Sequence, residues 1–285
     1  MNDKICLVTG ANSGIGLETA RGLAQQGATV VMTARSIERG EAALSDVRQS
    51  TGSSRVSLLH LDLADLASIR AAVETFSAGH SRLDVLVNNA GLMLGDRRET
   101  ADGFEMTFGV NHLGHFALTL LLLPSIEAAA PSRIINVSSA AHKAARGGLD
   151  LDDLMFTRRS YSPMAAYSAS KLANIHFTRE LARRLEGRGI SVNALHPGVV
   201  GSRFASDGDF KGLFSSLYGL ARPFMLTPTK GARTSLHVAT SAEGGQLSGA
   251  YFARQRPARV STAAQDDDAA RALWTLSEAL TGVSR

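Results

Sequence analysis

Tyr167 and Lys171 are the two residues of this chain whose types and spacing most directly suggest chemistry. They stand at the start of a run to Glu186 in which apolar residues recur at three- and four-residue steps, which predicts a helix with both side chains on one face. A phenol donates a proton poorly at neutral pH because its ordinary pKa is ~10, and a neighbouring ammonium lowers that pKa. The pair could therefore exchange a proton with a carbonyl or alcohol oxygen, although the same spacing also suits a packed Tyr beside a solvated Lys.

A second candidate site lies where the first predicted strand turns into a helix. Three glycines stand there, in the sequence Thr9-Gly10-Ala11-Asn12-Ser13-Gly14-Ile15-Gly16. Glycine allows a tight turn and a close approach of the backbone to a ligand, and a helix N-terminus offers free N–H groups to a pyrophosphate. The spacing differs from the commoner Gly-x-Gly-x-x-Gly, and a tight turn without a ligand is the alternative.

The end of the second predicted strand indicates which dinucleotide binds. Folds that prefer NAD usually place an acidic residue here for the ribose hydroxyls, whereas this chain has Ala34 and then Arg35. A guanidinium suits a 2′-phosphate through its charge and its planar set of donors. We predict NADP(H) as the cofactor, with a solvated Arg35 at the start of the next helix as the alternative.

Short apolar strands alternate with helical patterns along the chain, which predicts a parallel sheet with helices on both faces. We therefore expect an α/β, doubly wound Rossmann fold in a single domain over residues 1–285, with a C-terminal helix over about 265–282. The predicted strands are Ile5–Val8, Thr29–Thr33, Val56–Leu61, Leu83–Val87, Arg133–Val137 and Ser191–Leu195. The predicted helices include Gly14–Gln26, Ile37–Gln49, Leu66–Phe76 and Phe104–Glu127.

Composition excludes several classes of protein. A chain of 285 residues with 44% hydrophobic and 20% charged residues fits one ordinary globular domain. The net charge of +4 is spread over scattered basic pairs, so nucleic-acid binding is not expected. The single Cys6 permits no disulfide, and the most apolar run, Phe116–Leu123, is far shorter than the ~20 residues of a membrane span. We expect a cytoplasmic protein without a signal peptide or membrane span.

Taken together, the motifs resemble the short-chain dehydrogenase/reductase family over nearly the whole chain. The resemblance implies that the cofactor is bound by Gly10, Asn12, Ser13, Gly14, Ile15, Gly16, Arg35, Asp62, Leu63, Asn89, Ala90, Gly91, Tyr167, Lys171, Pro197, Gly198, Val200 and Ser202. Within this set the family uses Asp62-Leu63 at the adenine and Pro197-Gly198 on the nicotinamide side.

The same resemblance assigns catalytic roles to four residues. Ser139, the second of a Ser pair, would hydrogen-bond the substrate oxygen, and Tyr167 would transfer its proton. Lys171 would lower the pKa of Tyr167 and hold the nicotinamide ribose, and Asn111 would position a water that links Lys171 to solvent. A serine that caps a turn and an asparagine that satisfies helix backbone are the alternatives for Ser139 and Asn111.

Finer similarity indicates the retinol dehydrogenase-like branch. It is carried by residues 110–116, 167–174 and 196–200 and by Leu247-Ser248-Gly249-Ala250-Tyr251-Phe252. The branch mostly uses NADP and acts on apolar alcohols, aldehydes and ketones. The apolar stretch 201–227 would then be a substrate lid, with an ordinary amphipathic helix as the alternative. By family analogy, Phe116–Leu123 and Ala173–Leu185 would form a homodimer interface.

These observations predict an NADP(H)-dependent carbonyl reductase or alcohol dehydrogenase for a small apolar carbonyl or alcohol. An NAD-linked oxidative dehydrogenase and a catalytically silent NADP-binding sensor are the alternatives. No metal site is expected, because His112, His115, His142 and His196 have no acidic partner at ligand spacing.

Overall fold

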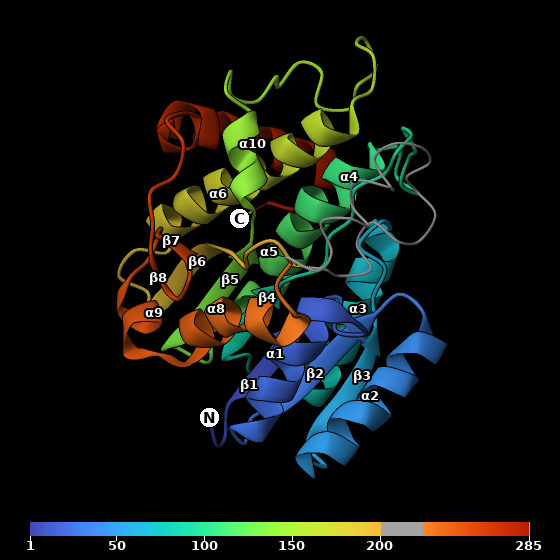
Figure 1. Cartoon of the computed structure of the whole chain (residues 1–285), viewed down its shortest axis with the longest axis vertical. Coiled ribbons are helices and arrows are strands. Elements are labelled where there is room, and N and C mark those ends of the chain that lie inside the picture. Colours follow the sequence, from blue (N-terminus) through green and yellow to red (C-terminus); the bar gives the residue numbers. More distant parts are fainter. Residues whose placement is uncertain (201–224, 285) are drawn as a thin grey trace.

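An eight-stranded sheet forms the centre of the molecule in the computed structural model, which describes residues 1–200 and 225–284 (Figure 1). The strand order is β3-β2-β1-β4-β5-β6-β7-β8, and every neighbouring pair is parallel except β7 with β8. The strands are β1 Ile5–Val8, β2 Thr29–Ala34, β3 Val56–His60, β4 Val85–Asn88, β5 Ser132–Val137, β6 Ile190–His196, β7 Tyr251–Ala253 and β8 Arg256–Pro257.

Helices cover both faces of the sheet, because alternate residues of each buried strand point to opposite sides. Cys6 and Val8 face one apolar cluster, and Leu7 between them faces the other. The first cluster includes α1 Gly14–Gln25, α2 Ile37–Thr51 and α8 Pro228–Thr240. The second includes α3 Leu66–Gly79, α5 Gly114–Glu127, α6 Pro163–Arg184 and α10 Asp267–Thr281. The predicted doubly wound α/β fold is confirmed.

Several element boundaries differ from the prediction. The predicted helix Phe104–Glu127 is divided into α4 Met106–Phe108, a π-helical turn Gly109–Leu113, and α5. Strands β7 and β8, of three and two residues, are too short to be recognised from periodicity. Other short helices in the described residues are α9 Ala242–Gln246 and the 3-10 turns Ala140–Ala144 and Ala263–Gln265. Most of the predicted lid, residues 201–224, lies outside the described residues.

The helical run Met106–Glu127 is long and apolar enough to cross a membrane, and 89% of its most apolar window is buried inside the protein. Part of that cover comes from α10, whose Trp274 ring lies 5.0 Å from Phe116 and 6.0 Å from Phe177 between centroids. Trp274 therefore covers part of the surface of α5 and α6 that was predicted to form a homodimer interface, and the homodimer stays a prediction. The prediction missed this contact because Trp274 is about 100 residues or more from both of its aromatic partners.

Candidate active site

The predicted catalytic residues come together at the carboxyl end of β5. Ser139 lies two residues after the end of that strand. Tyr167 and Lys171 project from α6, whose first turn is capped by Ser162 and begins with Pro163. The Tyr167 hydroxyl is hydrogen-bonded to Ser139, and the Lys171 ammonium lies 5.6 Å from the centre of the Tyr167 ring. The three side chains therefore form one cluster, as the sequence predicted.

The acid–base properties of this cluster differ from the expectation. Burial raises the pKa of Tyr167 to about 12, although the hydrogen bond with Ser139 opposes this shift. Burial also lowers the pKa of Lys171 to about 8. The Lys171 ammonium donates to the Val137 carbonyl at 3.0 Å. The pKa of Tyr167 is therefore raised in this structure and not lowered as predicted, because loss of hydration is the largest cause, and the phenol stays protonated.

The two adjacent serines at the end of β5 have different surroundings. The Ser138 hydroxyl is buried and donates to the Lys171 carbonyl at 2.7 Å, which fastens α6 to the sheet. The Ser139 hydroxyl accepts from Ala141 N at 3.1 Å, as in the turn-capping alternative, and also bonds Tyr167. Only Ser139 therefore lies beside the phenol, which agrees with the choice of the second serine.

Asn111 lies in the π-helical turn Gly109–Leu113, a kind of helix distortion often found at functional sites. Its amide nitrogen donates to the Leu92 carbonyl at 2.9 Å and to the Ser170 hydroxyl at 3.0 Å, and its amide oxygen accepts from Leu92 N at 2.8 Å. A Cβ atom placed on Gly91 would lie 3.2 Å from Asn111 Oδ1 and 3.3 Å from Lys171 Nζ. Asn111 and Lys171 therefore converge on Gly91, the last residue of the motif after β4.

A buried histidine that the sequence did not assign to the site joins Asn111 to the glycine-rich loop. His115 Nδ1 lies 3.2 Å from the Asn111 carbonyl, so Nδ1 must carry the proton. Burial lowers the pKa of His115 to about 3, so the ring is neutral and Nε2 accepts from the Thr9 hydroxyl at 2.9 Å. Thr9 Oγ1 in turn accepts from Asn89 N at 2.8 Å and Ala90 N at 2.9 Å. His115 thus fixes three segments of the predicted cofactor site relative to one another.

The glycine-rich loop has the backbone that its sequence predicted. Gly10 and Gly14 have φ values of 63° and 58°, in the left-handed region that favours glycine. A Cβ atom on Gly16 would collide with the Gly10 carbonyl, so the turn also needs glycine at that position.

The N-terminus of α1 is suited to a pyrophosphate. Within the described residues, the Ser13 side chain caps none of the first N–H groups of α1, and Asn12, Gly14 and Ile15 around it are half-buried. Free N–H groups at a helix N-terminus attract anions. This end of α1 therefore fits the phosphates of a nicotinamide cofactor.

The remaining predicted cofactor residues border the same edge of the sheet. Arg35 is exposed directly after β2, and Asp62 follows β3 with its Oδ1 accepting from Ala64 N at 2.9 Å, while Leu63 is buried. Pro197, Gly198 and Val200 follow β6, and Gly198 has a φ of 95°. Ser202 lies outside the described residues.

One further glycine, outside the predicted cofactor residues, contacts both cofactor loops. A Cβ atom on Gly231, in α8, would lie 2.6 Å from Val200 Cγ2 and 3.1 Å from Ile15 Cγ1. Gly231 thus allows α8 to close onto both cofactor loops, a role that sequence spacing alone does not reveal.

The histidines are held by protein hydrogen bonds. His112 Nε2 lies 3.0 Å from the Ser277 hydroxyl, His142 Nδ1 lies 2.6 Å from the Ser139 carbonyl, and His196 Nδ1 accepts from Ala140 N. In the described part of the chain, no group of three or more His, Cys, Asp or Glu side chains is arranged to hold a metal ion.

Comparisons with known proteins agree with this geometry. The model of the short chain dehydrogenase family matches residues 4–149 and 155–209. Retinol dehydrogenase 12 of Homo sapiens is 46% identical over 280 residues, which cover 98% of this chain and 87% of the human protein.

Two solved structures are also similar. An uncharacterized protein from Mycobacterium Paratuberculosis superposes with a TM-score of 0.78 and 39% identity, covering 99% of this chain and 95% of that one. The RhlG/NADP active-site complex of Pseudomonas aeruginosa superposes with a TM-score of 0.70 and 27% identity, covering 88% of this chain and 94% of that one.

Proposed function

Since the chain belongs to the short-chain dehydrogenase family, whose members are oxidoreductases that use a nicotinamide cofactor, we propose that it is an NADP(H)-dependent carbonyl reductase or alcohol dehydrogenase for apolar substrates. The observation that carries the proposal is the hydrogen-bonded pair of Ser139 and Tyr167 beside Lys171, at the same edge of the sheet as the free N-terminus of α1.

The cofactor, when bound, supplies or accepts the hydride at the substrate carbon. Ser139 hydrogen-bonds the substrate oxygen and orients it toward the Tyr167 hydroxyl. In the reducing direction Tyr167, which is protonated because of its raised pKa, donates its proton to that oxygen. Lys171 then stabilises the phenolate, and the bonds of Asn111 and Ser138 hold α6 at the required place.

The position of Arg35 supports NADP(H) rather than NAD(H). Ala11 N donates to the Thr33 carbonyl at 3.0 Å, so the glycine-rich loop runs beside the end of β2, two residues before Arg35. Neither residue 34 nor residue 35 is acidic, and Arg35 is exposed at the position where a ribose 2′-phosphate would need a cation.

An apolar substrate, such as a retinal-like aldehyde, is supported by two features. One is the similarity to retinol dehydrogenase 12 along nearly the whole chain. The other is a pair of exposed apolar side chains beside the loop after β6, where Leu226 N donates to the Val199 carbonyl at 2.8 Å. Apolar surface at the mouth of a site favours an apolar ligand.

The test is oxidation of NADPH and of NADH, followed by absorbance, with a panel of apolar aldehydes and ketones that includes retinal. We expect turnover with NADPH and little with NADH. Arg35→Ala should raise the KM for NADPH on the order of tenfold or more and leave the KM for NADH nearly unchanged, because only NADPH carries the phosphate. Arg70→Ala, which removes an exposed arginine from α3, is the matched control.

Equal changes in the two KM values would remove Arg35 from the phosphate site. Tight NADPH binding without turnover of any member of the panel would instead favour a catalytically silent sensor.

A further inference from the structure

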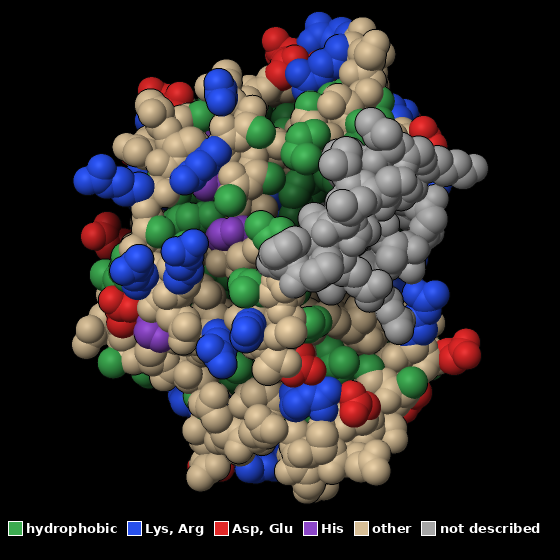
Figure 2. Space-filling model, viewed as in Figure 1, with side chains coloured by type: hydrophobic (Ala, Val, Ile, Leu, Met, Phe, Trp, Pro, Cys, Tyr) green, Lys and Arg blue, Asp and Glu red, His purple; other side chains and the backbone are tan. Residues whose placement is uncertain are grey.

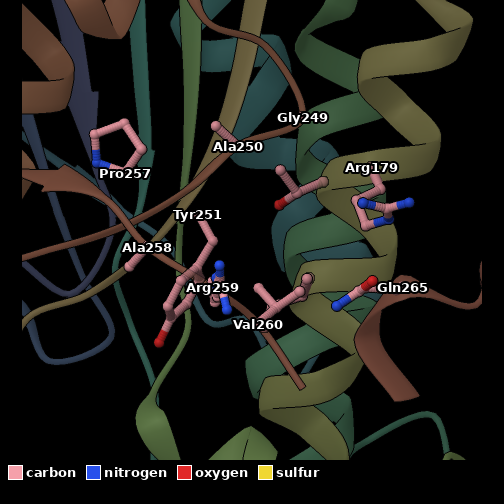
Figure 3. A pocket seen from close by; sticks show the side chains of 11 residues that line it. Arg179, Gly249, Ala250, Tyr251, Pro257, Ala258, Arg259, Val260 and Gln265 are labelled. Carbon is pink, nitrogen blue, oxygen red and sulfur yellow. The ribbon is translucent and has the colours of Figure 1, made fainter. Parts of the chain in front are cut away.

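A hollow of about 370 Å³ lies between α6 and the hairpin of β7 and β8, and no step of the proposed reaction uses it (Figure 3). One wall comes from Ile175 and Arg179 of α6, and the other from Tyr251 of β7 and the segment from Pro257 to Val260. The volume is within the range of pockets that take small organic molecules.

The hollow is separate from the catalytic cluster. Arg179 follows Tyr167 by twelve residues on the same helix, which corresponds to ~18 Å along the axis. Ile175, the lining residue of α6 nearest to the phenol, follows Tyr167 by eight residues, or ~12 Å, so a ligand in the hollow would sit more than two helical turns from the reacting phenol.

Two guanidinium groups, on Arg179 and Arg259, line the hollow, and three acidic residues, Asp266 to Asp268, follow the lining residue Gln265. Arg179 Nη2 pairs with Asp267 at 2.7 Å, but Arg179 Nε is enclosed and has no acceptor among the described residues. Arg259 is exposed, and no ion pair joins it to an acidic side chain in the described parts of the chain. The hollow thus has one guanidinium that no protein carboxylate neutralises.

The rest of the hairpin adds to the positive potential. Arg254 and Arg256 are exposed on the same hairpin as Arg259, and no Asp or Glu occurs between residues 244 and 265. Figure 2 shows Lys and Arg side chains gathered over this side of the molecule. At the hairpin tip Arg254 and Gln255 have φ values of 53° and 61°, a strained backbone for residues other than Gly, Asn or Asp. Arg254 thus places a cation at the hairpin tip, where Gly, Asn or Asp would have a less strained backbone.

The remaining lining combines apolar and polar groups. Ile175, Val260 and the ring of Tyr251 supply apolar surface, Thr178 supplies a hydroxyl, and Gln265 offers an amide at the side of the hollow in Figure 3. A cavity with an apolar wall and an unneutralised guanidinium is suited to a molecule with an apolar body and one anionic group.

We propose that this hollow binds a small organic anion, a carboxylate or phosphate attached to a short apolar body, with Arg259 at the anionic group. The apolar body packs against Ile175 and Tyr251. The site is independent of the proposed reaction, so its test does not depend on turnover.

The experiment is calorimetric titration of the full chain with octanoate, octyl phosphate, octanol and inorganic phosphate. Octanoate or octyl phosphate should bind, and the stronger of the two identifies the preferred head group. Arg259→Gln should weaken that binding at least about tenfold, the effect of one lost charge-assisted hydrogen bond. Arg256→Gln, on the same hairpin but not in the lining, should change it much less.

A second variant tests the cavity itself. Ala258 is exposed and lines the hollow, so Ala258→Trp should fill it without disturbing the core and should abolish the Arg259-dependent binding. The proposal is overturned if Arg259→Gln binds as well as the wild type, if Arg256→Gln is equally impaired, or if inorganic phosphate and octanoate bind alike. Equal unfolding temperatures for the variants exclude misfolding as the cause.

Discussion

The two halves of α6 are both buried, but they are held by different forces. The first half is fastened by polar bonds, from Lys171 to the Val137 carbonyl and from Asn111 to Ser170, and Asn174 at the middle of the helix also donates to Val137. The second half packs aromatic rings, with Phe177 stacked on Trp274 of α10, and its polar contacts are Asn136 to Thr178 and Arg179 to Asp267. Within the described residues, both ring nitrogens of His176 and Trp274 Nε1 have no hydrogen-bond partner.

This difference indicates that the two halves of α6 have different roles, one in catalysis and one in stability. Burying an ammonium against few partners costs free energy, so the first half of α6 positions reactive groups at the expense of stability. Burying apolar rings stabilises the fold but fixes no proton or donor in place. Substitutions in the first half should therefore affect catalysis, and those in the second half should affect unfolding.

The largest expected effect is that of Lys171→Met on turnover. Turnover should fall by ~10²–10⁴, the usual contribution of acid–base catalysis. The free energy of unfolding should stay equal or rise, because a buried cation is replaced by an apolar chain of similar length. Steady-state kinetics and thermal unfolding check both statements, with Lys230→Met as the exposed control. A strongly destabilised but fully active Lys171→Met variant would contradict the catalytic role given to the first half of α6.

Trp274→Ala should have the opposite outcome. Removing a ring that lies against Phe116, Phe177 and the Arg184 guanidinium should lower the free energy of unfolding by ~3–5 kcal/mol. The kcat/KM of the folded variant should remain close to that of the wild type, because no reactive group touches Trp274. Denaturant unfolding and kinetics at low temperature measure the two quantities, and Thr275→Ala is the exposed neighbour for comparison.

The pH dependence of the free energy of unfolding should show the lowered pKa of Lys171. Burial lowers its pKa from 10.5 to about 8, so between these values the unfolded chain holds a proton that the folded chain has released. The stability contributed by this group therefore rises as the pH increases through that window and is lost as the pH falls. Across this pH window, the free energy of unfolding of the wild type should increase by on the order of 3 kcal/mol relative to that of Lys171→Met. Parallel stability curves for the two proteins would show that Lys171 keeps its ordinary pKa.

A smaller effect is expected for Ser138→Ala. Loss of its bond to the Lys171 carbonyl should lower the free energy of unfolding by ~1 kcal/mol. Its turnover should exceed that of Ser139→Ala, which loses the hydroxyl beside Tyr167. If Ser138→Ala were the less active of the two, the assignment of the catalytic serine would be wrong.

Much of this arrangement is predictable from local sequence. The strand ends at Val8, Asn88 and Val137 place the loops that follow them at one edge of a parallel sheet, and helical spacing puts Tyr167 and Lys171 on one face. These predictions depend only on neighbouring residues, which is why the fold prediction is confirmed and the cluster assembles as expected.

The remaining features depend on contacts between distant residues. His115 and Thr9 are 106 residues apart, so their hydrogen bond cannot be read from spacing. The packing of Trp274 on α5 and α6 is equally remote in sequence and covers a surface that family analogy had assigned to a dimer. The pKa values of Tyr167 and Lys171 depend on burial, which pairwise charge reasoning omits.

The most direct test of the account is Tyr167→Phe, measured for NADPH binding by fluorescence and for reduction of the best aldehyde under single-turnover conditions. We expect NADPH affinity and unfolding temperature close to those of the wild type and a rate at least ~10² lower, because only the proton donor is removed. Tyr161→Phe, which removes a hydroxyl bonded to Glu105 in the segment before α6, should retain activity. Unchanged reduction by Tyr167→Phe would contradict the proposed role of this helix.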